Sequence, residues 1–189
     1  MGSSYKQITP EQEKLIRDAK LFFVASVASD LSGGPEGQGP VNISPKGGTP
    51  LHVIDEHRVA YLDYVGSGAE TIAHLRENGR IVIMWCAFQG PPKIIRFHGR
   101  GMVLLPDDAE YRLLRPLFPA DPSGRAIITV SIDRIADSCG FGVPLYEFTR
   151  QRSQLPDWVA RKGEDGLRAY QAEKNASSID GLPAVRTPE

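Results

Sequence analysis

The sequence predicts a mainly β protein of the α+β class, built on an antiparallel sheet that closes into a barrel with a few peripheral helices. Two observations lead to this fold. Apolar segments of strand length follow one another from residue 21 to residue 135, and most are separated by connections of hairpin length. A parallel sheet needs a crossover helix between successive strands, and the sequence offers too few helices for that arrangement.

The N-terminal elements are a short helix and a buried strand. Thr9 is placed to cap a helix, Pro10 suits its first turn and Gln12 completes a capping box. The segment 21–28, LFFVASVA, is rich in aromatic and branched residues and predicts a buried strand. Residues 29–39 contain four glycines and a proline, which indicates a surface connection.

The central part of the chain predicts the rest of the barrel. In RVAYLDY, residues 58–64, alternation places Val59, Tyr61 and Asp63 on one face of a strand and Ala60, Leu62 and Tyr64 on the other. The other predicted strands cover residues 41–44, 51–54, 80–88, 94–105 and 126–135.

Helices are expected at three further places. Ser67 and Glu70 have the spacing of a capping box, so a helix should follow and end at Asn78-Gly79. A second helix is expected over 107–114, and one or two over 156–174. The small, polar chain after Asn175 is expected to be loosely held. This pattern suggests a barrel domain over 1–150 and a C-terminal helical extension and tail over 151–189 that pack on the barrel.

Composition excludes several classes of function. The formal net charge is −1 with 24% charged residues, which gives no bulk attraction to nucleic acid or to an anionic membrane. No apolar run approaches the ~20 residues of a membrane span. Cys86 and Cys139 stand in no metal-binding spacing, so no metal site is expected. The N-terminus, MGSSYK, lacks the apolar run of a secretory signal, and we expect a cytoplasmic protein.

Two stretches have the features of an anion site. GPVNISPKGGTP, residues 39–50, begins as a strand and is then interrupted by Pro45, Gly47 and Gly48 around a single cation, Lys46. In YLDYVGSGAETIAHL, a strand leads through a glycine turn into a helix, and such a turn presents free N–H groups to an anion. Ser67 and Thr71 add hydroxyl donors there. An ordinary capped helix is the alternative for this turn.

A third stretch, PPKIIRFHGRG, places Arg96, His98 and Arg100 on one face of a strand, with Ile95 and Phe97 on the other. A solvated polar face explains this pattern equally well. His98 is a candidate proton donor. His52, His57 and His74 show no spacing typical of a catalytic triad or a metal site.

Taken in order, NISPKG, the strand–GSG–helix turn, ENGRIVIMW and PPKIIRFHGRG resemble the pyridoxamine 5′-phosphate oxidase-like family, over about residues 21–135. CGFGVP, residues 139–144, resembles a subgroup of uncharacterised flavoproteins. The resemblance implies a six-stranded antiparallel split barrel, a homodimer and FMN between the protomers. It also implies that Trp85 and the loop 139–142 close the site from the partner. The cofactor-binding residues it implies are Val41, Asn42, Ser44, Lys46, Leu62, Asp63, Ser67, Gly68, Thr71, Trp85 and Arg96.

The chain departs from the oxidases of this family at three places. Gly68 and Ala69 stand where the oxidases have an Arg-Lys pair that grips phosphate, and Lys93 and Ile94 stand where they have Arg-Gln. An Arg-Leu-His-type substrate motif does not occur after Arg150. We therefore do not expect pyridoxamine phosphate to be the substrate.

The function predicted from sequence is that of an FMN-dependent oxidoreductase acting on an unknown small molecule. One alternative is a non-catalytic module that binds a flavin, haem or another planar ligand on the same fold. Another is a reductase that uses a deazaflavin in place of FMN.

Overall fold

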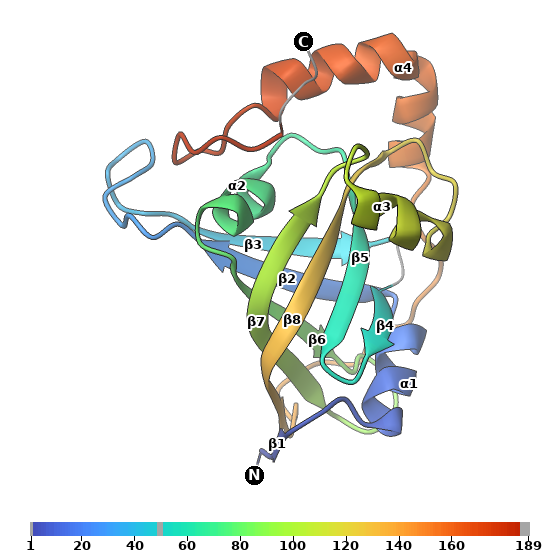
Figure 1. Cartoon of the computed structure of the whole chain (residues 1–189). Coiled ribbons are helices and arrows are strands. Elements are labelled where there is room, and N and C mark those ends of the chain that lie inside the picture. Colours follow the sequence, from blue (N-terminus) through green and yellow to red (C-terminus); the bar gives the residue numbers. More distant parts are fainter. Residues whose placement is uncertain (1, 49–50, 186–189) are drawn as a thin grey trace.

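The computed structural model describes residues 2–48 and 51–185 and consists of one antiparallel sheet with helices around it (Figure 1). The strands follow the spatial order β3-β2-β6-β7-β8-β5-β4, and β1 pairs with β8. The mainly β antiparallel prediction is confirmed, with more strands than the six that the resemblance implied. The strands are β1 (Ser4–Tyr5), β2 (Leu21–Val27), β3 (Val41–Gly47), β4 (Leu51–Asp55), β5 (Arg58–Tyr64), β6 (Arg80–Cys86), β7 (Ile94–Leu104) and β8 (Gly124–Ser138).

The barrel is open between β3 and β4, the two ends of the strand path. β3 was expected to stop at Ser44, but it continues through Pro45 and Lys46 to Gly47. Pro45 lies opposite Phe23 of β2. An edge strand tolerates proline because one side of its backbone has no strand to bond, and the missing N–H costs little there.

Helix α1 (Pro10–Asp18) begins as the sequence predicts. The Gln12 N–H donates to Thr9 Oγ1 over 3.2 Å, and the Thr9 N–H donates to Gln12 Oε1 over 3.0 Å. The other helices are α3 (Ala109–Leu114), followed by a 3₁₀ turn over Arg115–Leu117, and α4 (Gln154–Lys174), which is kinked at Gly163. None of the helices in the described ranges is long and apolar enough to span a bilayer.

Helix α2 (Glu70–Glu77) starts later than the predicted capping box requires. Its N-cap is Ala69, and no side chain caps it. Ser67 lies two residues before the N-cap, too early to reach the free N–H groups of the first turn. The capping prediction was therefore wrong. The helix buries five consecutive residues, Thr71 to Leu75, against the barrel and contacts β2 and β7.

Two apolar clusters occupy the two faces of β5, as its alternation predicts. Val59 and Tyr61 belong to the main barrel core. Ala60 and Leu62 face a smaller cluster under α3. A third cluster joins α4 to Val65 through Val159 and Leu167, so the C-terminal helix packs against the end of β5.

The segment after α4 is packed against the barrel, contrary to the expectation from its composition. Ala184 and Val185 are buried, and their N–H groups donate to the carbonyls of Ala176 and Asn175. The Arg76 guanidinium of α2 donates to the Ala184 carbonyl. Figure 1 shows this segment beside α2. The small side chains of this segment allow its tight turn to lie against α2. The part of the prediction that concerns residues 186–189 falls outside the described residues.

Candidate functional site

The inward face of β3 carries a row of polar side chains at the opening of the barrel. Asn42, Ser44 and Lys46 are half-buried and point towards α2 and β5, whereas Val41 and Ile43 on the opposite face are about two-thirds exposed, at 67% and 66%. We call the region where this row meets the first turn of α2 and the end of β5 the β3–α2 groove. It contains most of the cofactor-binding residues predicted from sequence.

At one end of the groove, Lys46 lies in a buried ionic cluster. Its ammonium donates to Asp63 Oδ1 over 2.7 Å, and Arg125 Nε donates to Asp63 Oδ2 over 2.9 Å. Burial by itself would raise the pKa of the fully buried Asp63, but the charges and hydrogen bonds of Lys46 and Arg125 outweigh it and hold this pKa below its usual value. Lys46 is thus already paired with a carboxylate inside its own chain, and no local sequence pattern indicates this pairing.

Two donors beside this cluster have no hydrogen-bond partner among the described atoms. They are Arg125 Nη1 and the Tyr61 hydroxyl, both buried. Burial raises the pKa of Tyr61 well above its ordinary value, and the Asp63 carboxylate adds to that rise, so the phenol stays protonated. The cluster is therefore rich in donors beyond those that Asp63 accepts.

At the other end of the groove, Asn42 connects β3 to α2. Its Nδ2 donates to Thr71 Oγ1 over 2.9 Å and to Ser26 Oγ over 3.0 Å, and its Oδ1 accepts from Ser44 Oγ over 3.1 Å. The contact brings Asn42, Ser44 and Thr71 together, as the prediction required. It also adds Ser26 of β2, which sequence analysis did not single out.

The glycine turn before α2 forms the rim of the groove. Ser67 is exposed there, and the Gly66 carbonyl accepts from Asn175 Nδ2 over 2.8 Å. A Cβ built on Gly68 would overlap the Glu70 carboxylate, so Glu70 folds back over the turn. An acidic side chain thus occupies the helix N-terminus, where the sequence predicted room for a phosphate.

Four predicted cofactor contacts lie outside the groove. Val41 is on the outer, exposed face of β3. Leu62 is fully buried under α3, on the face of β5 opposite to Asp63. Trp85 is a core residue, 1% exposed, in contact with the rings of Phe22 and Phe97. Arg96 lies on the outer face of the sheet and donates to Ser138 Oγ over 3.1 Å. Within one chain it therefore cannot meet the same anion as Lys46.

The histidines behave differently from one another. His98 lies on the outer face, and burial together with Arg134 and Arg96 lowers its pKa. His74 is fully buried in a Ser–His–Asp arrangement that its sequence spacing did not reveal: Nδ1 lies 3.0 Å from Ser26 Oγ, and Nε2 lies 2.7 Å from Asp180 Oδ2. Ser26 Oγ is enclosed between the His74 ring and the Asn42 amide, so it is not presented to a substrate carbonyl. The arrangement is not that of a hydrolase.

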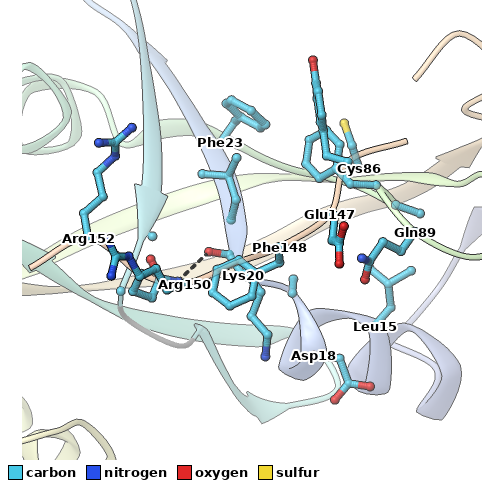
Figure 2. Close-up of a pocket in the computed structure, with 18 of the residues that line it drawn as sticks. Leu15, Asp18, Lys20, Phe23, Cys86, Gln89, Glu147, Phe148, Arg150 and Arg152 are labelled. Atoms are coloured by element: carbon cyan, nitrogen blue, oxygen red, sulfur yellow. Dashed lines mark hydrogen bonds between the residues drawn. The ribbon is translucent and has the colours of Figure 1, made fainter. Parts of the chain in front are cut away.

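A large cavity adjoins the Lys46 end of the groove. Its volume is about 1240 Å³, and it reaches Gly47, Gly48 and Tyr64. Segment 146–152 crosses it and is fixed by two hydrogen bonds, Tyr146 N–H to the Phe88 carbonyl over 3.0 Å and Gln151 Nε2 to the Lys20 carbonyl over 3.2 Å. Figure 2 shows Phe23 and Phe148 in this cavity, together with Lys20, Arg150 and Arg152. Sequence analysis missed the cavity because its walls come from distant segments.

Within the described ranges, no group of three or more His, Cys, Asp or Glu side chains is arranged to hold a metal ion. Cys86 and Cys139 are both free thiols, and burial raises the pKa of Cys86. The functional groups of the groove are its hydrogen-bond donors and the charged side chains of Lys46, Asp63 and Glu70.

Comparison with known proteins relates this groove to a family. Residues 8–139 match the model of the pyridoxamine 5′-phosphate oxidase family. The pyridoxamine 5′-phosphate oxidase family protein ustO of Aspergillus flavus is 36% identical over 186 residues, covering 88% of this chain and 71% of that protein.

Two solved structures share the fold at lower identity. HupZ of Group A Streptococcus aligns with a TM-score of 0.51 and 23% identity, over 68% of this chain and 91% of HupZ. A candidate pyridoxamine 5′-phosphate oxidase from Lactobacillus delbrueckii aligns with a TM-score of 0.51 and 18% identity, over 70% of this chain and 97% of that one. Sequence and fold lead to the same assignment: the chain belongs to the pyridoxamine 5′-phosphate oxidase family.

Proposed function

We propose that this protein is a homodimeric, FMN-dependent oxidoreductase that binds the flavin in the β3–α2 groove and acts on a small organic substrate. Family membership supports a flavin. The observation that carries the proposal is the inward polar row of β3 meeting the first turn of α2, where Asn42 and Thr71 are joined over 2.9 Å. The row provides amide, hydroxyl and ammonium donors within one groove, which suits a phosphorylated polyol chain.

The residues of the groove fit FMN with one exception. Asn42 and Ser44 provide polar contacts for a ribityl chain, and Thr71 adds a hydroxyl for the phosphate at the N-terminus of the eight-residue helix α2, which favours an anion. Glu70 is the exception, because its carboxylate opposes a phosphate at the turn. A bound flavin supplies the electron-transfer chemistry, and the protein positions and tunes it.

The outer face of β3 supports the dimer. Val41 and Ile43 are largely exposed, and both lie on an edge strand of the sheet. Exposed apolar side chains on an edge strand favour association with another surface. We assign this face to a second copy of the chain. The predicted contact of Arg96 with the flavin then requires that second copy, because Arg96 lies on the same outer face as these residues.

The cavity beside the groove supports a substrate with a planar, largely apolar body. It shares Gly47 and Gly48 with the Lys46 end of β3 and is lined by aromatic side chains that include Phe23 and Phe148. Pyridoxamine phosphate is not proposed as the substrate, since Gly68 and Ala69 provide no cationic side chain at the turn. We expect no pyridoxal phosphate formation at ordinary turnover, ~1 s⁻¹ or faster.

Absorbance of the purified protein is the first test. A bound flavin gives a two-band yellow spectrum, haem gives a Soret band and a deazaflavin gives a single blue-violet band. Chemically reduced, protein-bound FMN should then be reoxidised by oxygen or a quinone. A flavin that binds but exchanges electrons with no acceptor would leave the non-catalytic alternative in place.

A pair of variants tests the groove itself. Thr71→Val removes a hydroxyl from the first turn of α2, whereas Thr129→Val removes an equally buried hydroxyl from β8, on a strand position away from the groove. One hydrogen bond to a charged group is worth about 1.5–3 kcal/mol, so Thr71→Val should weaken FMN at least tenfold and Thr129→Val should not. Equal FMN affinity of the two variants, measured by fluorescence titration, would remove the site from this groove.

A further inference from the structure

A chain of five side chains runs from the C-terminal segment to the β3–α2 groove. It starts at the Asp180 carboxylate, passes through His74, Ser26 and Asn42, and ends at Thr71, with contacts of 2.7, 3.0, 3.0 and 2.9 Å. Asp180 has a side chain 2% exposed, and His74 and Ser26 are buried. Asp180 is thus tied to a groove residue 109 positions earlier in the sequence without touching the groove itself.

The donor and acceptor capacities of these groups give the chain one direction. Asp180 only accepts as a carboxylate, so His74 donates to it from Nε2. With a neutral ring, Nδ1 then accepts, and the Ser26 hydroxyl donates to it. Ser26 Oγ is left to accept from Asn42, whose second Nδ2 hydrogen goes to Thr71 Oγ1.

The consequence falls on Thr71. Its oxygen is occupied as an acceptor by Asn42, so its hydroxyl hydrogen remains to be donated. The other amide atom of Asn42, Oδ1, accepts from Ser44 Oγ. Because a hydroxyl can also accept, it is Ser26, which already donates to His74, that sets the orientation of the carboxamide. Thr71 is therefore set as a donor. A charged phosphate oxygen is favoured at this point over a neutral hydroxyl, because a charge-assisted hydrogen bond is the stronger one.

The same C-terminal segment also holds the turn that borders the groove. Asn175 Nδ2 donates to the Gly66 carbonyl over 2.8 Å, and the Ala184 carbonyl accepts from Arg76 of α2. Segment 175–185 is therefore attached to the turn, to the middle of α2 and, through His74, to β2. It thus holds the turn and helix α2, which border the groove, and connects them to β2.

We propose that Asp180, acting through His74 and Ser26, is a positioning residue that sets Asn42 and Thr71 as oriented donors and so favours a phosphorylated flavin over its unphosphorylated form. This inference rests on the proposed function. It goes beyond it by giving the C-terminal segment a part in ligand selection. None of Asp180, His74 and Ser26 needs to touch the ligand for this effect.

Ser26→Ala is the sharpest test, because it cuts the chain in its middle and leaves the His74–Asp180 contact in place. The probes are FMN and riboflavin, and Thr129→Val is the matched control for the loss of one buried hydroxyl. We expect Ser26→Ala to weaken FMN about fivefold to tenfold and riboflavin much less, with both ligands unchanged in Thr129→Val. A purely structural role would lower the melting temperature and weaken both ligands alike, and that result would overturn the proposal.

The tautomer of His74 gives a readout that needs no ligand. Long-range ¹H–¹⁵N NMR of the wild type at neutral pH should show a neutral ring protonated at Nε2, and Asp180→Ala should remove this preference. A ring protonated at Nδ1, or at both nitrogens, would overturn the directed chain. If the wild type binds neither FMN nor riboflavin, the proposed function fails on its own account, and the tautomer still decides whether the chain is directed as described.

Discussion

The two faces of strand β3 differ in polarity, and the polar face is the one directed into the protein. On the inner face, three polar residues, Asn42, Ser44 and Lys46, point into the protein and are hydrogen-bonded. On the outer face, Val41 and Ile43 point away from it and are largely exposed. A strand at the edge of an ordinary barrel would have its apolar side inward. The inversion indicates that β3 serves two surfaces, a polar groove within the chain and an apolar contact outside it.

The inner face is itself divided. At the Lys46 end, charge is compensated by charge, because Asp63 accepts from both Lys46 and Arg125. At the Asn42 end, the contacts run through amide, hydroxyl and imidazole groups to a single distant carboxylate. Removal of either partner of a buried ion pair strongly lowers the free energy of unfolding. In a chain of neutral groups, a lost hydrogen bond disturbs the orientation of the donors and acceptors before it lowers the free energy of unfolding. The two ends should therefore fail differently when they are altered.

Asp63→Asn should have the largest effect. It leaves the Lys46 and Arg125 cations buried without their counter-charge, which typically costs about 3–5 kcal/mol of the free energy of unfolding. The control is Asp165→Asn, since Asp165 is an exposed acid of α4 that pairs with Arg168. It should change the free energy of unfolding by less than about 0.5 kcal/mol. Urea unfolding measures both. A loss below about 1 kcal/mol for Asp63→Asn would mean that the cluster is not held by charge.

Ile43→Asp addresses the outer face. Because Ile43 is exposed within one chain, the change should cost the monomer little, but it places a charge in the proposed contact between copies. We expect a dimer for the wild type and a folded monomer for the variant in light scattering. Leu113→Asp, at a 78% exposed position of α3, should remain dimeric. A wild type that is already monomeric at micromolar concentration would contradict the assignment of this face.

The pH dependence of stability follows from the lowered pKa of Asp63. A carboxyl group whose pKa is lower in the folded state contributes stability above its unfolded value, about 3.9, and loses it as the pH falls through the folded value. The wild type should therefore lose stability below about pH 4. The free energy of unfolding of Asp63→Asn should depend less steeply on pH in the same window. Parallel curves for the two proteins would show that Asp63 titrates alike in the folded and unfolded states.

The smallest effect is expected from Glu70→Gln, and it should be a gain. Glu70 folds over Gly68 at the turn, so removing its charge should raise the affinity for FMN about threefold, with little change for riboflavin. Glu77→Gln, at the other end of α2, is the control. Because the charges are partly exposed, the gain should shrink as salt is added. Weaker FMN binding in Glu70→Gln would mean that the carboxylate assists the ligand.

Local sequence signals predicted the elements well wherever the cause was local. Thr9 and Gln12 form their capping box, and the alternation along β5 divides its residues between two clusters as expected. Pro45 misled the analysis because its effect depends on whether the strand lies at an edge, which only the whole sheet decides. The Ser67–Glu70 capping box failed for a similar reason, since the helix starts where it packs best on the barrel.

The site was predictable in part. Motifs on adjacent elements identified five residues that the structure brings together, namely Asn42, Ser44, Lys46, Asp63 and Thr71. The contribution of Ser26, Arg125 and Asp180 was not predictable, because each joins the site through a contact between residues 16 to 106 positions apart. The sequence left open whether Trp85 contacts a cofactor or packs in the core, and its burial shows that it is a core residue.

The packing of residues 175–185 has a consequence for how the protein is made. Synthesis proceeds from the N-terminus, and folding can begin before the chain is complete. The barrel strands all precede residue 139, yet His74 Nε2, the Arg76 guanidinium and the Gly66 carbonyl each have a partner in residues 175–184. On the ribosome the barrel can therefore assemble with an unfinished groove. The partners of these groups become available only after residues 175–184 have been synthesised.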